Sequence, residues 1–347
     1  MSEKISRLQS TQNSLVDLFE RSISYLRLSI TDRCNLTCLY CVPEESDDGP
    51  CKLSHGELLS FEELLRVVHV AVDMGISKVR LTGGEPLIRR NVLSFIGELG
   101  RIKGLNDIRL TTNGVLLDRY AQALVDGGVT KVNISLDTLR RQRFEKITGY
   151  DLFDQVWRGI ERSLHAGFAL VKLNVVVMRG INDDEVLHFA ELSRKRPLQV
   201  RFIEFMPIGD FSRWNKEIYV STDELLERLS RHGELVPAPR GKADGPARIY
   251  RFGQNPTGNL GFISPLSHKF CDRCNRLRLT SEGRLRSCLL HDAEVDLRKV
   301  LRSGGGTSEI REALLTAIRN KPQEHGLMKL QEIDGGSCHG RMSRIGG

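Results

Sequence analysis

The feature that most constrains this chain is the stretch Cys34-Asn-Leu-Thr-Cys38-Leu-Tyr-Cys41, which places three thiols on one short segment. It follows the apolar run Tyr25-Leu-Arg-Leu-Ser-Ile30, which predicts a buried β-strand. Residues 31–33 then turn the chain, so the cysteines lie on a loop at the carboxyl end of that strand, where α/β proteins place their chemistry. Thiolates at this density favour zinc or an iron–sulfur cluster over hard cations.

The number of thiols narrows the kind of site. A structural zinc site normally has four ligands, and no fourth Cys or His occurs in the expected place. A four-iron cluster held by three thiolates would keep one iron open to an outside ligand. Zinc with three protein ligands and cysteines that simply fill the core remain as alternatives at this point.

Composition limits the class of protein. The chain has 347 residues, 40% hydrophobic and 27% charged, which is typical of a globular protein. No segment approaches the ~18 apolar residues of a membrane span. The amino-terminal segment, which contains Glu3, Asp17 and Glu20, lacks the apolar core of a signal peptide, so we expect a cytoplasmic protein without a membrane partner. The formal charge of +7 indicates polyanionic partners, whereas only 6% aromatic residues argues against a reader of single-stranded nucleic acid.

Cysteines recur far along the chain. Eight cysteines in a protein expected in the cytoplasm indicate metal or redox use rather than disulfides. A second triplet comprises Cys271, Cys274 and Cys288, while Cys51 and Cys338 stand alone. Two separated triplets predict two metal centres.

Between the triplets, β-branched runs alternate with amphipathic segments, which predicts a parallel sheet covered by helices. The predicted strands are Tyr25–Ile30, Lys78–Thr82, Asp107–Thr111, Val129–Leu136, Val171–Met178 and Gln199–Met206. The predicted helices are Phe61–Met74, with Ser60 as N-cap, Asn91–Arg101, Leu116–Val125, Phe153–Ala166 and Asp183–Lys195. Six strands are too few to close an eight-stranded barrel, which leaves a doubly wound sheet or an incomplete barrel.

The regular alternation ends after Pro207. A helix over Asp223–Arg231 and a Pro- and Gly-rich stretch over 237–246 precede short strands and two further helices. These elements are Arg248–Phe252, Leu260–Ser264, Arg276–Thr280, Arg284–Cys288, Leu297–Ser303 and Ser308–Asn320, with Ser281-Glu-Gly283 as a hairpin turn. We therefore divide the chain into an amino-terminal lead-in (1–24) with a short helix near Ser14–Arg21, a core domain (25–236) and a smaller α+β domain (237–347) without periodicity beyond residue 321.

Several polar residues lie where the predicted strands would bring them together. Thr82-Gly83-Gly84-Glu85-Pro86 ends the second strand, and paired glycines allow close approach of a ligand. Thr111, Ser135 and Met206 lie near strand ends, whereas Arg27, Arg80 and Lys172 lie inside strands. A buried arginine such as Arg27 needs an anion, for example a phosphate.

The second triplet has its own candidate partners. Zinc could gain a fourth ligand from His268 or His291. Arg276 and Arg278 follow Cys274 in a strand, so alternation places both guanidinium groups on one face. An open iron site beside two arginines would suit an anionic ligand that carries a coordinating base.

The C-x3-C-x2-C spacing resembles that of the radical S-adenosylmethionine (SAM) enzymes. With the second triplet and Gly261-Phe-Ile-Ser-Pro265, the chain from Tyr25 to the terminal Gly346-Gly347 resembles the GTP 3′,8-cyclase family, also called molybdenum cofactor biosynthesis protein A. The resemblance implies an incomplete (β/α)6 TIM-like barrel and a smaller α+β domain with a second 4Fe-4S cluster. The implied site residues are as follows: Cys34, Cys38, Cys41, Cys271, Cys274 and Cys288 for the two clusters; Tyr40, Gly84, Glu85, Ser135 and Met206 for SAM; and Arg27, Arg80, Thr111, Lys172, Arg276, Leu277 and Arg278 for GTP.

The resemblance also implies the reaction. A one-electron reductant reduces the first cluster, SAM yields a 5′-deoxyadenosyl radical, and abstraction of hydrogen from C3′ of GTP gives (8S)-3′,8-cyclo-7,8-dihydroguanosine 5′-triphosphate. This lyase-type step precedes cyclic pyranopterin monophosphate synthase in molybdenum cofactor biosynthesis. The chain itself adds a hypothesis: Arg344, Gly346 and Gly347 thread the open barrel and act in catalysis.

Two other functions remain open on sequence grounds, and so does assembly as a homodimer. One is a radical SAM enzyme that modifies a peptide or another small molecule with the help of an auxiliary cluster. The other is a zinc-stabilised nucleic-acid-binding protein, which only the basic charge favours.

Overall fold

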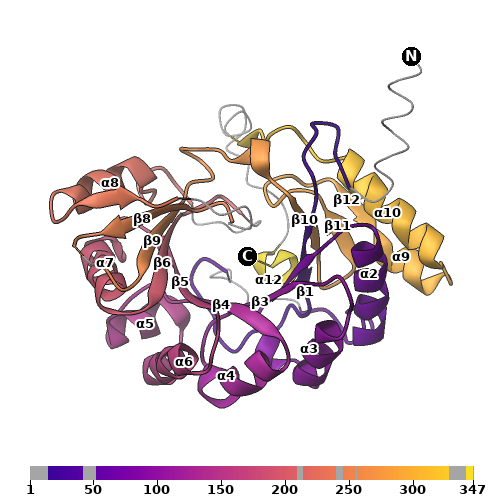
Figure 1. Ribbon diagram of the computed structural model, residues 1–347, viewed down its shortest axis with the longest axis horizontal. Helices are drawn as coiled ribbons and strands as arrows, with labels where there is room; N and C mark the ends of the chain where they lie inside the picture. Colours follow the sequence, from indigo (N-terminus) through magenta and orange to yellow (C-terminus); the bar gives the residue numbers. More distant parts are fainter. Residues whose placement is uncertain are drawn as a thin grey trace.

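One twelve-stranded sheet organises the chain. The computed structural model describes residues 15–41, 52–208, 214–239, 245–254, 256–327 and 341–346. In these residues the strand order is β12-β11-β10-β1-β2-β3-β4-β5-β6-β9-β8-β7, and β12 and β7 are the two edges. Figure 1 shows the sheet curved around a central space with helices outside it, which is an open barrel. The predicted fold class is confirmed.

The six strands predicted for the barrel form its parallel centre. They are β1 (Tyr25–Ser29), β2 (Lys78–Thr82), β3 (Asp107–Thr112), β4 (Val129–Ser135), β5 (Leu170–Val177) and β6 (Leu198–Glu204). Each pairs in parallel with the next strand in the chain. All five residues of β2 are buried, as expected of a strand covered on both faces.

Strands from the carboxyl-terminal third extend this sheet at both ends. β9 (Asn259–Ile263) pairs in parallel with β6, and β10 (Arg276–Leu279) pairs in parallel with β1. Antiparallel strands follow on each side: β8 (Arg248–Phe252) and β7 (Leu235–Pro237) beyond β9, and β11 (Arg284–Arg286) and β12 (Glu294–Asp296) beyond β10. The sheet therefore runs across residue 237, and our division of the chain there stays a prediction.

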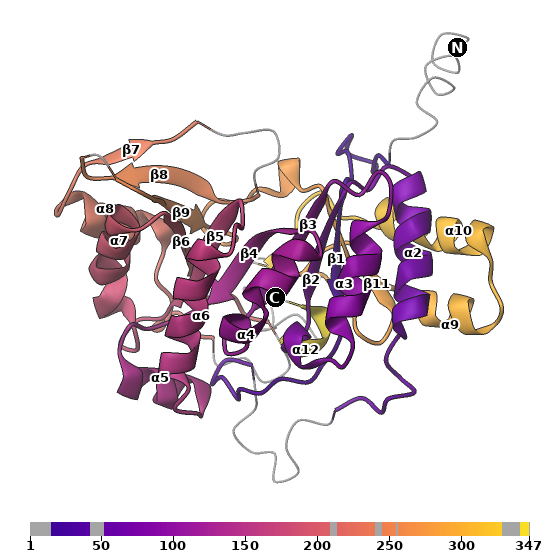
Figure 2. The ribbon, with the colours of Figure 1, turned by 60° about the horizontal axis from the view of Figure 1, so that its bottom comes forward.

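Helices cover the outer face of the sheet, as both ribbon views show (Figures 1 and 2). They are α2 (Phe61–Asp73), α3 (Val92–Gly100), α4 (Leu117–Asp126), α5 (Arg141–Thr148), α6 (Phe153–His165), α7 (Val186–Lys195), α8 (Thr222–Ser230), α9 (Leu297–Arg302) and α10 (Thr307–Arg319). Ser60 caps α2 as predicted: its hydroxyl accepts from the Glu63 N–H at 3.1 Å, and the Glu63 carboxylate accepts from the Ser60 N–H at 2.7 Å. Such a cap is worth about 1 kcal/mol.

The inner face of the sheet is unusually polar. Arg27 on β1 lies beside Arg80 on β2, and Arg80 lies beside Arg109 on β3 in the strand register. Neighbouring residues such as Leu26, Leu28 and Leu81 point the other way and belong to the apolar core under the helices. The alternation thus separates a core that stabilises the barrel from an interior that can hold a charged ligand.

Three local predictions need correction or addition. Residues 15–21 form a turn with a bridge between Val16 and Ser22, so the short helix expected near Ser14–Arg21 is wrong over these residues. The tail, expected to be irregular, contains the short helix α12 (Met342–Ile345). Helix α5 was not predicted because only three of its residues are buried and its apolar pattern is short.

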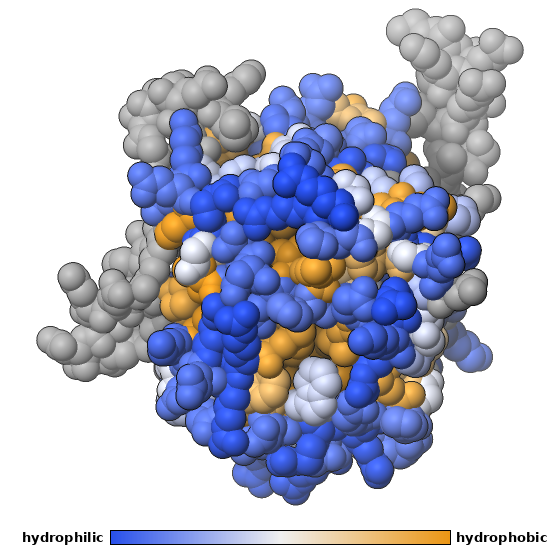
Figure 3. All heavy atoms as spheres, turned by 90° about the vertical axis from the view of Figure 1, so that its left-hand side faces the viewer, coloured by the Kyte–Doolittle hydropathy of each residue, from blue (hydrophilic) through white to orange (hydrophobic). Residues whose placement is uncertain are grey.

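The outer surface offers no sign of a membrane span. Within the part of the chain that the structure describes, no helix combines the length and the apolar character needed to cross a bilayer. Figure 3 shows hydrophilic side chains covering most of the face that carries α7 and α8, with apolar side chains confined to areas between them. Ion pairs tie α8 to the segment between β5 and α7: Arg228 pairs with Asp183 at 3.0 Å, and Glu224 pairs with Arg179 at 2.6 Å.

Candidate functional site

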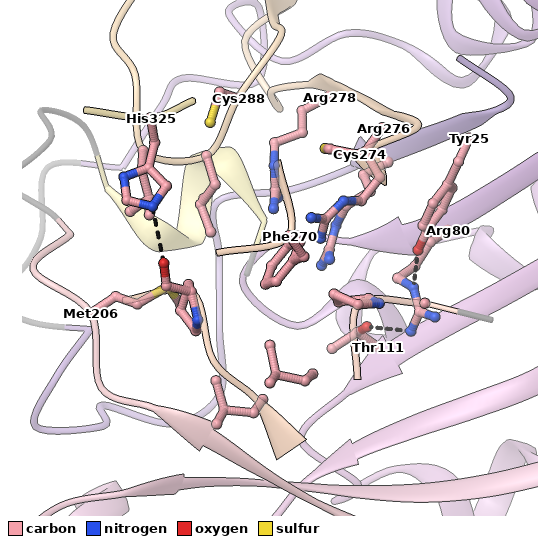
Figure 4. A pocket seen from close by; sticks show the side chains of 18 of the residues that line it. Tyr25, Arg80, Thr111, Met206, Phe270, Cys274, Arg276, Arg278, Cys288 and His325 are labelled. Carbon is pink, nitrogen blue, oxygen red and sulfur yellow. Dashed lines mark hydrogen bonds between the residues drawn. The ribbon is translucent and has the colours of Figure 1, made fainter. Parts of the chain in front are cut away.

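A pocket occupies the inside of the open barrel (Figure 4). Its empty volume, open mouth included, is about 1160 Å³, which suits a small-molecule ligand. Residues from both ends of the chain line it. Those predicted from the sequence are Arg27, Arg80, Thr111, Met206, Cys271, Cys274, Arg276, Arg278 and Cys288. The structure therefore brings most of the predicted GTP contacts together with the whole second triplet.

The second triplet forms part of the pocket wall. Cys271 begins the short helix η3 (Cys271–Arg273), Cys274 ends it, and Cys288 follows β11. Burial raises the pKa of Cys274, but the charges of Arg276 and Lys321 and hydrogen bonds from Arg276 outweigh burial and lower the pKa to about 6. A thiol that ionises near neutral pH is prepared to bind a metal.

Two arginines continue the same wall along β10. Arg276 and Arg278 are two residues apart, and both line the pocket, as alternation predicts. The Arg276 guanidinium lies 5.0 Å from the centre of the Phe270 ring, and Arg278 Nη1 donates to the Gly346 carbonyl at 2.6 Å. Leu277 between them is buried in the apolar core, so only its backbone remains for the predicted contact with GTP.

Further cations line the neighbouring strands β1 and β2. Arg80 Nε donates to the Tyr25 hydroxyl at 2.5 Å, and its Nη1 donates to the Thr111 hydroxyl at 3.1 Å. Burial raises the pKa of Tyr25, but Arg80 and Arg27 outweigh burial and lower the pKa to about 7. Burial also lowers the pKa of Arg27 to about 10. Cations this deeply buried favour an anionic ligand.

Lys172 and Ser135 lie just outside the set of pocket-lining residues. In the strand register Lys172 lies beside Asn133, and Ser135 lies beside Asn174, and both asparagines line the pocket. Lys172 is only 3% exposed. Burial, followed by the charges of Arg201 and Arg80, lowers its pKa to about 5.

The first triplet lies on the loop that follows β1. Backbone bonds from Thr37 N to Thr148 O and from Leu39 N to Ile147 O, both 2.9 Å, fasten this loop to the end of α5. Burial raises the pKa of Cys34 and Cys38, and it raises that of Cys41 to about 12; in each case nearby acidic groups or neighbouring thiols add to the effect. These three thiols thus form one group, in a less cationic setting than Cys274.

The Gly83-Gly84-Glu85 segment braces that loop. A Cβ on Gly84 would lie 2.2 Å from the Arg33 carbonyl oxygen, so glycine is needed here for the contact between the two loops. The Glu85 carboxylate is 0% exposed and accepts from Leu87 N, Thr112 Oγ1 and Asn113 N. Glu85 therefore acts as a structural brace, and its predicted contact with the SAM amino group stays a prediction.

Two of the remaining predicted SAM contacts occupy different places. The Tyr40 hydroxyl donates to Asp137 Oδ2 at 2.5 Å, which ties the first-triplet loop to the segment after β4. Burial raises the pKa of Asp137 to about 6, although this hydrogen bond and one from Val176 N oppose the shift. Met206 follows β6 and lines the pocket near Cys288 and Met342, in a small apolar cluster.

The tail enters the barrel, as Figure 1 shows for α12. The carbonyl of Arg344 accepts from Ser281 N at 3.1 Å, and Gly346 packs against Thr82. The Arg344 side chain, however, pairs with Glu282 at 3.4 Å and is not among the pocket-lining residues, so its catalytic role stays a prediction. Gly347, together with Cys51 and Cys338, lies outside the described residues.

Comparison with known proteins gives the chain its family. Residues 28–193 match the model of the Radical SAM superfamily, and residues 198–327 match that of Molybdenum Cofactor Synthesis C. The GTP 3′,8-cyclase of Thermodesulfovibrio yellowstonii is 51% identical over 308 residues, which cover 88% of this chain and 94% of that protein. This chain belongs to the GTP 3′,8-cyclase family.

Other relatives agree with that assignment. The GTP 3′,8-cyclase of Pelotomaculum thermopropionicum is 47% identical over 332 residues, covering 95% of this chain and 99% of that protein. Among solved structures, SuiB of Streptococcus suis bound to S-adenosylmethionine matches 94% of this chain and 71% of its own, with a TM-score of 0.62 and 13% identity. At that identity SuiB supports the fold alone.

Membership of the GTP 3′,8-cyclase family implies SAM and a 4Fe-4S cluster, and the first triplet fits that cluster by its donors. It offers three soft thiols on one loop. The zinc alternatives gain no support: His268 pairs with Asp223 at 2.7 Å, and His291 accepts from Ala293 N at 3.3 Å. In the described part of the chain, no three His, Cys, Asp or Glu side chains converge as ligands of a single ion.

Sequence reasoning missed part of the pocket of this GTP 3′,8-cyclase family member. Tyr25, Arg109, Asn133, Asn174 and Arg201 also line it. The buried amide oxygens of Asn133 and Asn174 have no hydrogen-bond partner among the described residues, so both can accept from a ligand. The signal that could have found all of them except Arg201 is the period-2 pattern of the strands, because Tyr25, Arg109, Asn133 and Asn174 are each two residues from a predicted contact.

Proposed function

We propose that this protein converts GTP to (8S)-3′,8-cyclo-7,8-dihydroguanosine 5′-triphosphate, an early step of molybdenum cofactor biosynthesis. Cys34, Cys38 and Cys41 would hold the 4Fe-4S cluster that binds SAM. Cys271, Cys274 and Cys288 would hold a second 4Fe-4S cluster, because three soft thiols beside compensating cations suit its negative charge. The proposal also includes a one-electron reductant for the first cluster, a downstream cyclic pyranopterin monophosphate synthase that acts on the product, and a cytoplasmic location.

The observation that supports it most is the composition of one pocket wall. The second triplet, Arg276 and Arg278 line one wall of the pocket, Arg27 and Arg80 continue it on β1 and β2, and Arg109 and Arg201 line the pocket from β3 and β6. A ligand that fits this wall carries a base that coordinates iron and several negative charges that bind arginine. A purine nucleoside triphosphate has both.

Held by Cys34, Cys38 and Cys41, the reduced cluster with bound SAM would supply the radical chemistry that removes hydrogen from C3′ of the ribose, so that C3′ could bond to C8 of the base. The chain itself fixes the ribose near the first triplet by holding the two ends of the nucleotide. Arg27, Arg80 and Lys172 neutralise the phosphates. Arg276 lies between the phosphates and the base. The barrel wall limits access of solvent to the reacting carbon atoms.

Anaerobic turnover tests the proposal. The protein is reconstituted with iron and sulfide and incubated with SAM, GTP and dithionite, with ATP in a matched reaction. We expect 5′-deoxyadenosine and an isomer of GTP by mass analysis, and no isomer of ATP. Formation of 5′-deoxyadenosine without any GTP isomer would show that the substrate is a different one.

Arg276→Ala and Arg278→Ala should each weaken GTP binding by about tenfold or more, because each removes a charge-assisted contact worth ~1.5–3 kcal/mol. Binding is measured by anaerobic equilibrium titration, with iron content as a check on folding. Arg284→Ala is the matched control, since Arg284 lies on neighbouring β11 and pairs with Asp296 at 2.8 Å. If the affinity of these variants for guanosine falls as much as their affinity for GTP, these arginines do not bind the phosphates.

GTP binding should be accompanied by uptake of about one proton near pH 7.5 through Lys172. Its pKa of about 5 makes it neutral in the free protein, and a bound triphosphate favours the ammonium form, so the proton is taken up on binding. Calorimetry in buffers of different ionisation enthalpy measures this number. Lys172→Met should reduce the uptake, and the same uptake in that variant would assign the proton to another group, for example Tyr25, whose pKa is about 7.

A further inference from the structure

Two buried cations lie beside the second triplet although neither belongs to its motif. Arg21 is 7% exposed, and Lys321 is 3% exposed. Burying a cation is unfavourable unless hydrogen bonds compensate for lost water. The partners of these two side chains therefore indicate what the fold uses them for.

Arg21 joins three segments that are far apart in the sequence. Its Nε donates to Asp17 Oδ2 at 2.5 Å, and Asp17 Oδ1 in turn accepts from the backbone N–H of Arg21 at 3.0 Å. Its Nη1 donates to the carbonyl of Cys271 at 2.8 Å and to that of Gln323 at 3.0 Å, while Nη2 donates to the carbonyl of Pro322 at 2.7 Å. The guanidinium thus holds a cluster ligand against the segment that follows α10.

Lys321 makes the corresponding connection to the other two cysteines. Its ammonium donates to the carbonyl of Arg276 at 2.9 Å and to the carbonyl of Ser287. Arg276 lies two residues after Cys274, and Ser287 immediately precedes Cys288. The positive charge of Lys321 also acts on the thiols of both cysteines.

His325 completes the segment on the Cys271 side. Its ring Nε2 lies 3.0 Å from the carbonyl oxygen of Pro265, and its backbone N–H faces the Cys271 sulfur. Figure 4 shows His325 on the same side of the pocket as Cys288. Each of the three thiols therefore has a contact with Arg21 or with residues 321–325, directly or through an adjacent backbone carbonyl.

We propose that Arg21 and Lys321 form a cationic bracket that positions Cys271, Cys274 and Cys288 and tunes the charge of the cluster they hold. The inference rests on the proposed function, which places the second cluster there. A cluster with three thiolates becomes more negative on reduction, and a nearby buried cation stabilises the reduced form. Both residues act through other groups, so they are positioning residues.

The test uses the full-length protein, reconstituted anaerobically. Lys321→Met removes the positive charge and keeps a side chain of similar length, whereas Lys321→Arg keeps the charge. Arg21→Lys keeps the charge but loses the planar guanidinium that donates several hydrogen bonds at once. The matched control is Arg319→Met, which removes a cation two residues from Lys321, where Arg319 pairs with Glu312 at 2.8 Å on the surface of α10. Electron paramagnetic resonance spectra of the reduced protein are recorded with and without GTP. The part of the signal that changes when GTP is added is assigned to the second cluster.

We expect Lys321→Met to move the midpoint potential of the GTP-sensitive signal to more negative values and to leave the SAM-sensitive signal unchanged. In Lys321→Arg the midpoint potential of the GTP-sensitive signal should stay close to that of wild type. Arg21→Lys should lose about half of the bound iron, the share of one of two clusters, and keep SAM binding. In metal-free Arg21→Lys protein, alkylation mapped by peptide mass analysis should become several-fold faster at Cys271, Cys274 and Cys288 only, because the charges are kept while the segment that holds these thiols is loosened.

The proposal is overturned if Lys321→Met and Arg21→Lys match Arg319→Met in midpoint potential, iron content and alkylation rates. It is also overturned if both clusters change alike, because the bracket would then be a general support of the fold. Should a charge-removing variant fail to fold, Lys321→Arg and the alkylation rates of Arg21→Lys decide. Wild-type turnover of GTP in the same preparation tests the proposed function separately.

Discussion

Replacing Cys38 with alanine should abolish formation of 5′-deoxyadenosine, whereas Cys274→Ala should leave SAM binding intact and disrupt GTP binding. Cys38 lies on the loop fastened to α5, and Cys274 lies on the pocket wall beside Arg276. The two loops end in different parts of the open barrel, so losing one set of ligands leaves the other in place. Iron content, SAM binding and GTP binding are measured for both proteins.

The expected pattern is reciprocal. Each variant should retain about half of the wild-type iron, since each keeps one of two complete triplets. Cys38→Ala should still bind GTP with an affinity close to that of wild type. Equal loss of SAM binding in both variants would defeat this division of labour between the triplets.

The barrel strands could be predicted from sequence because their signal is local. Lys78–Thr82 was predicted with the bounds of β2, and it is a short run in which all residues are buried. The cap of α2 was also predictable, since Ser60 and Glu63 lie three residues apart and each side chain bonds to the other's backbone. Both features depend on neighbours within a few residues.

The placement of the carboxyl-terminal strands could not be predicted in this way. β10 lies beside β1, about 250 residues earlier in the chain, and β9 lies beside β6. Their short patterns are compatible with a separate small domain, and only long-range packing selects the edges of the barrel. This placement is what brings Arg276 and Arg278 next to Tyr25 and Arg27.

The same limit applies to individual site residues. Glu85 was predicted as a ligand contact from its motif, and the structure adds three donors, from its own loop and from the end of β3, that the motif did not indicate. Arg344 was predicted to act in catalysis, and the structure adds an ion pair with Glu282 in the turn after β10. Competing partners of this kind are invisible until the register of the sheet is known.

Deleting Gly346 and Gly347 should leave both clusters and the affinity for GTP nearly unchanged while cyclisation falls about 100-fold, the size expected when reacting groups are slightly misplaced. The Gly346 carbonyl accepts from Arg278 at 2.6 Å, so the tail holds a pocket arginine in place. Single-turnover rates of GTP isomer formation, with SAM cleavage followed in the same samples, measure the effect.

A point substitution makes the same test without shortening the chain. Gly346 has φ of +78°, and a Cβ there would lie 2.3 Å from Thr82 Cγ2, so Gly346→Ala should displace the tail from the barrel wall. Ser343→Ala changes a side chain of the same short helix and keeps the Ser343 carbonyl that accepts from the Ser29 hydroxyl at 3.5 Å, so it serves as the control. The rate of cyclisation in Gly346→Ala should fall as it does in the deletion variant, and the rate in Ser343→Ala should match that of wild type. A truncated protein that cyclises GTP at the full-length rate would show that the tail is only a frayed end.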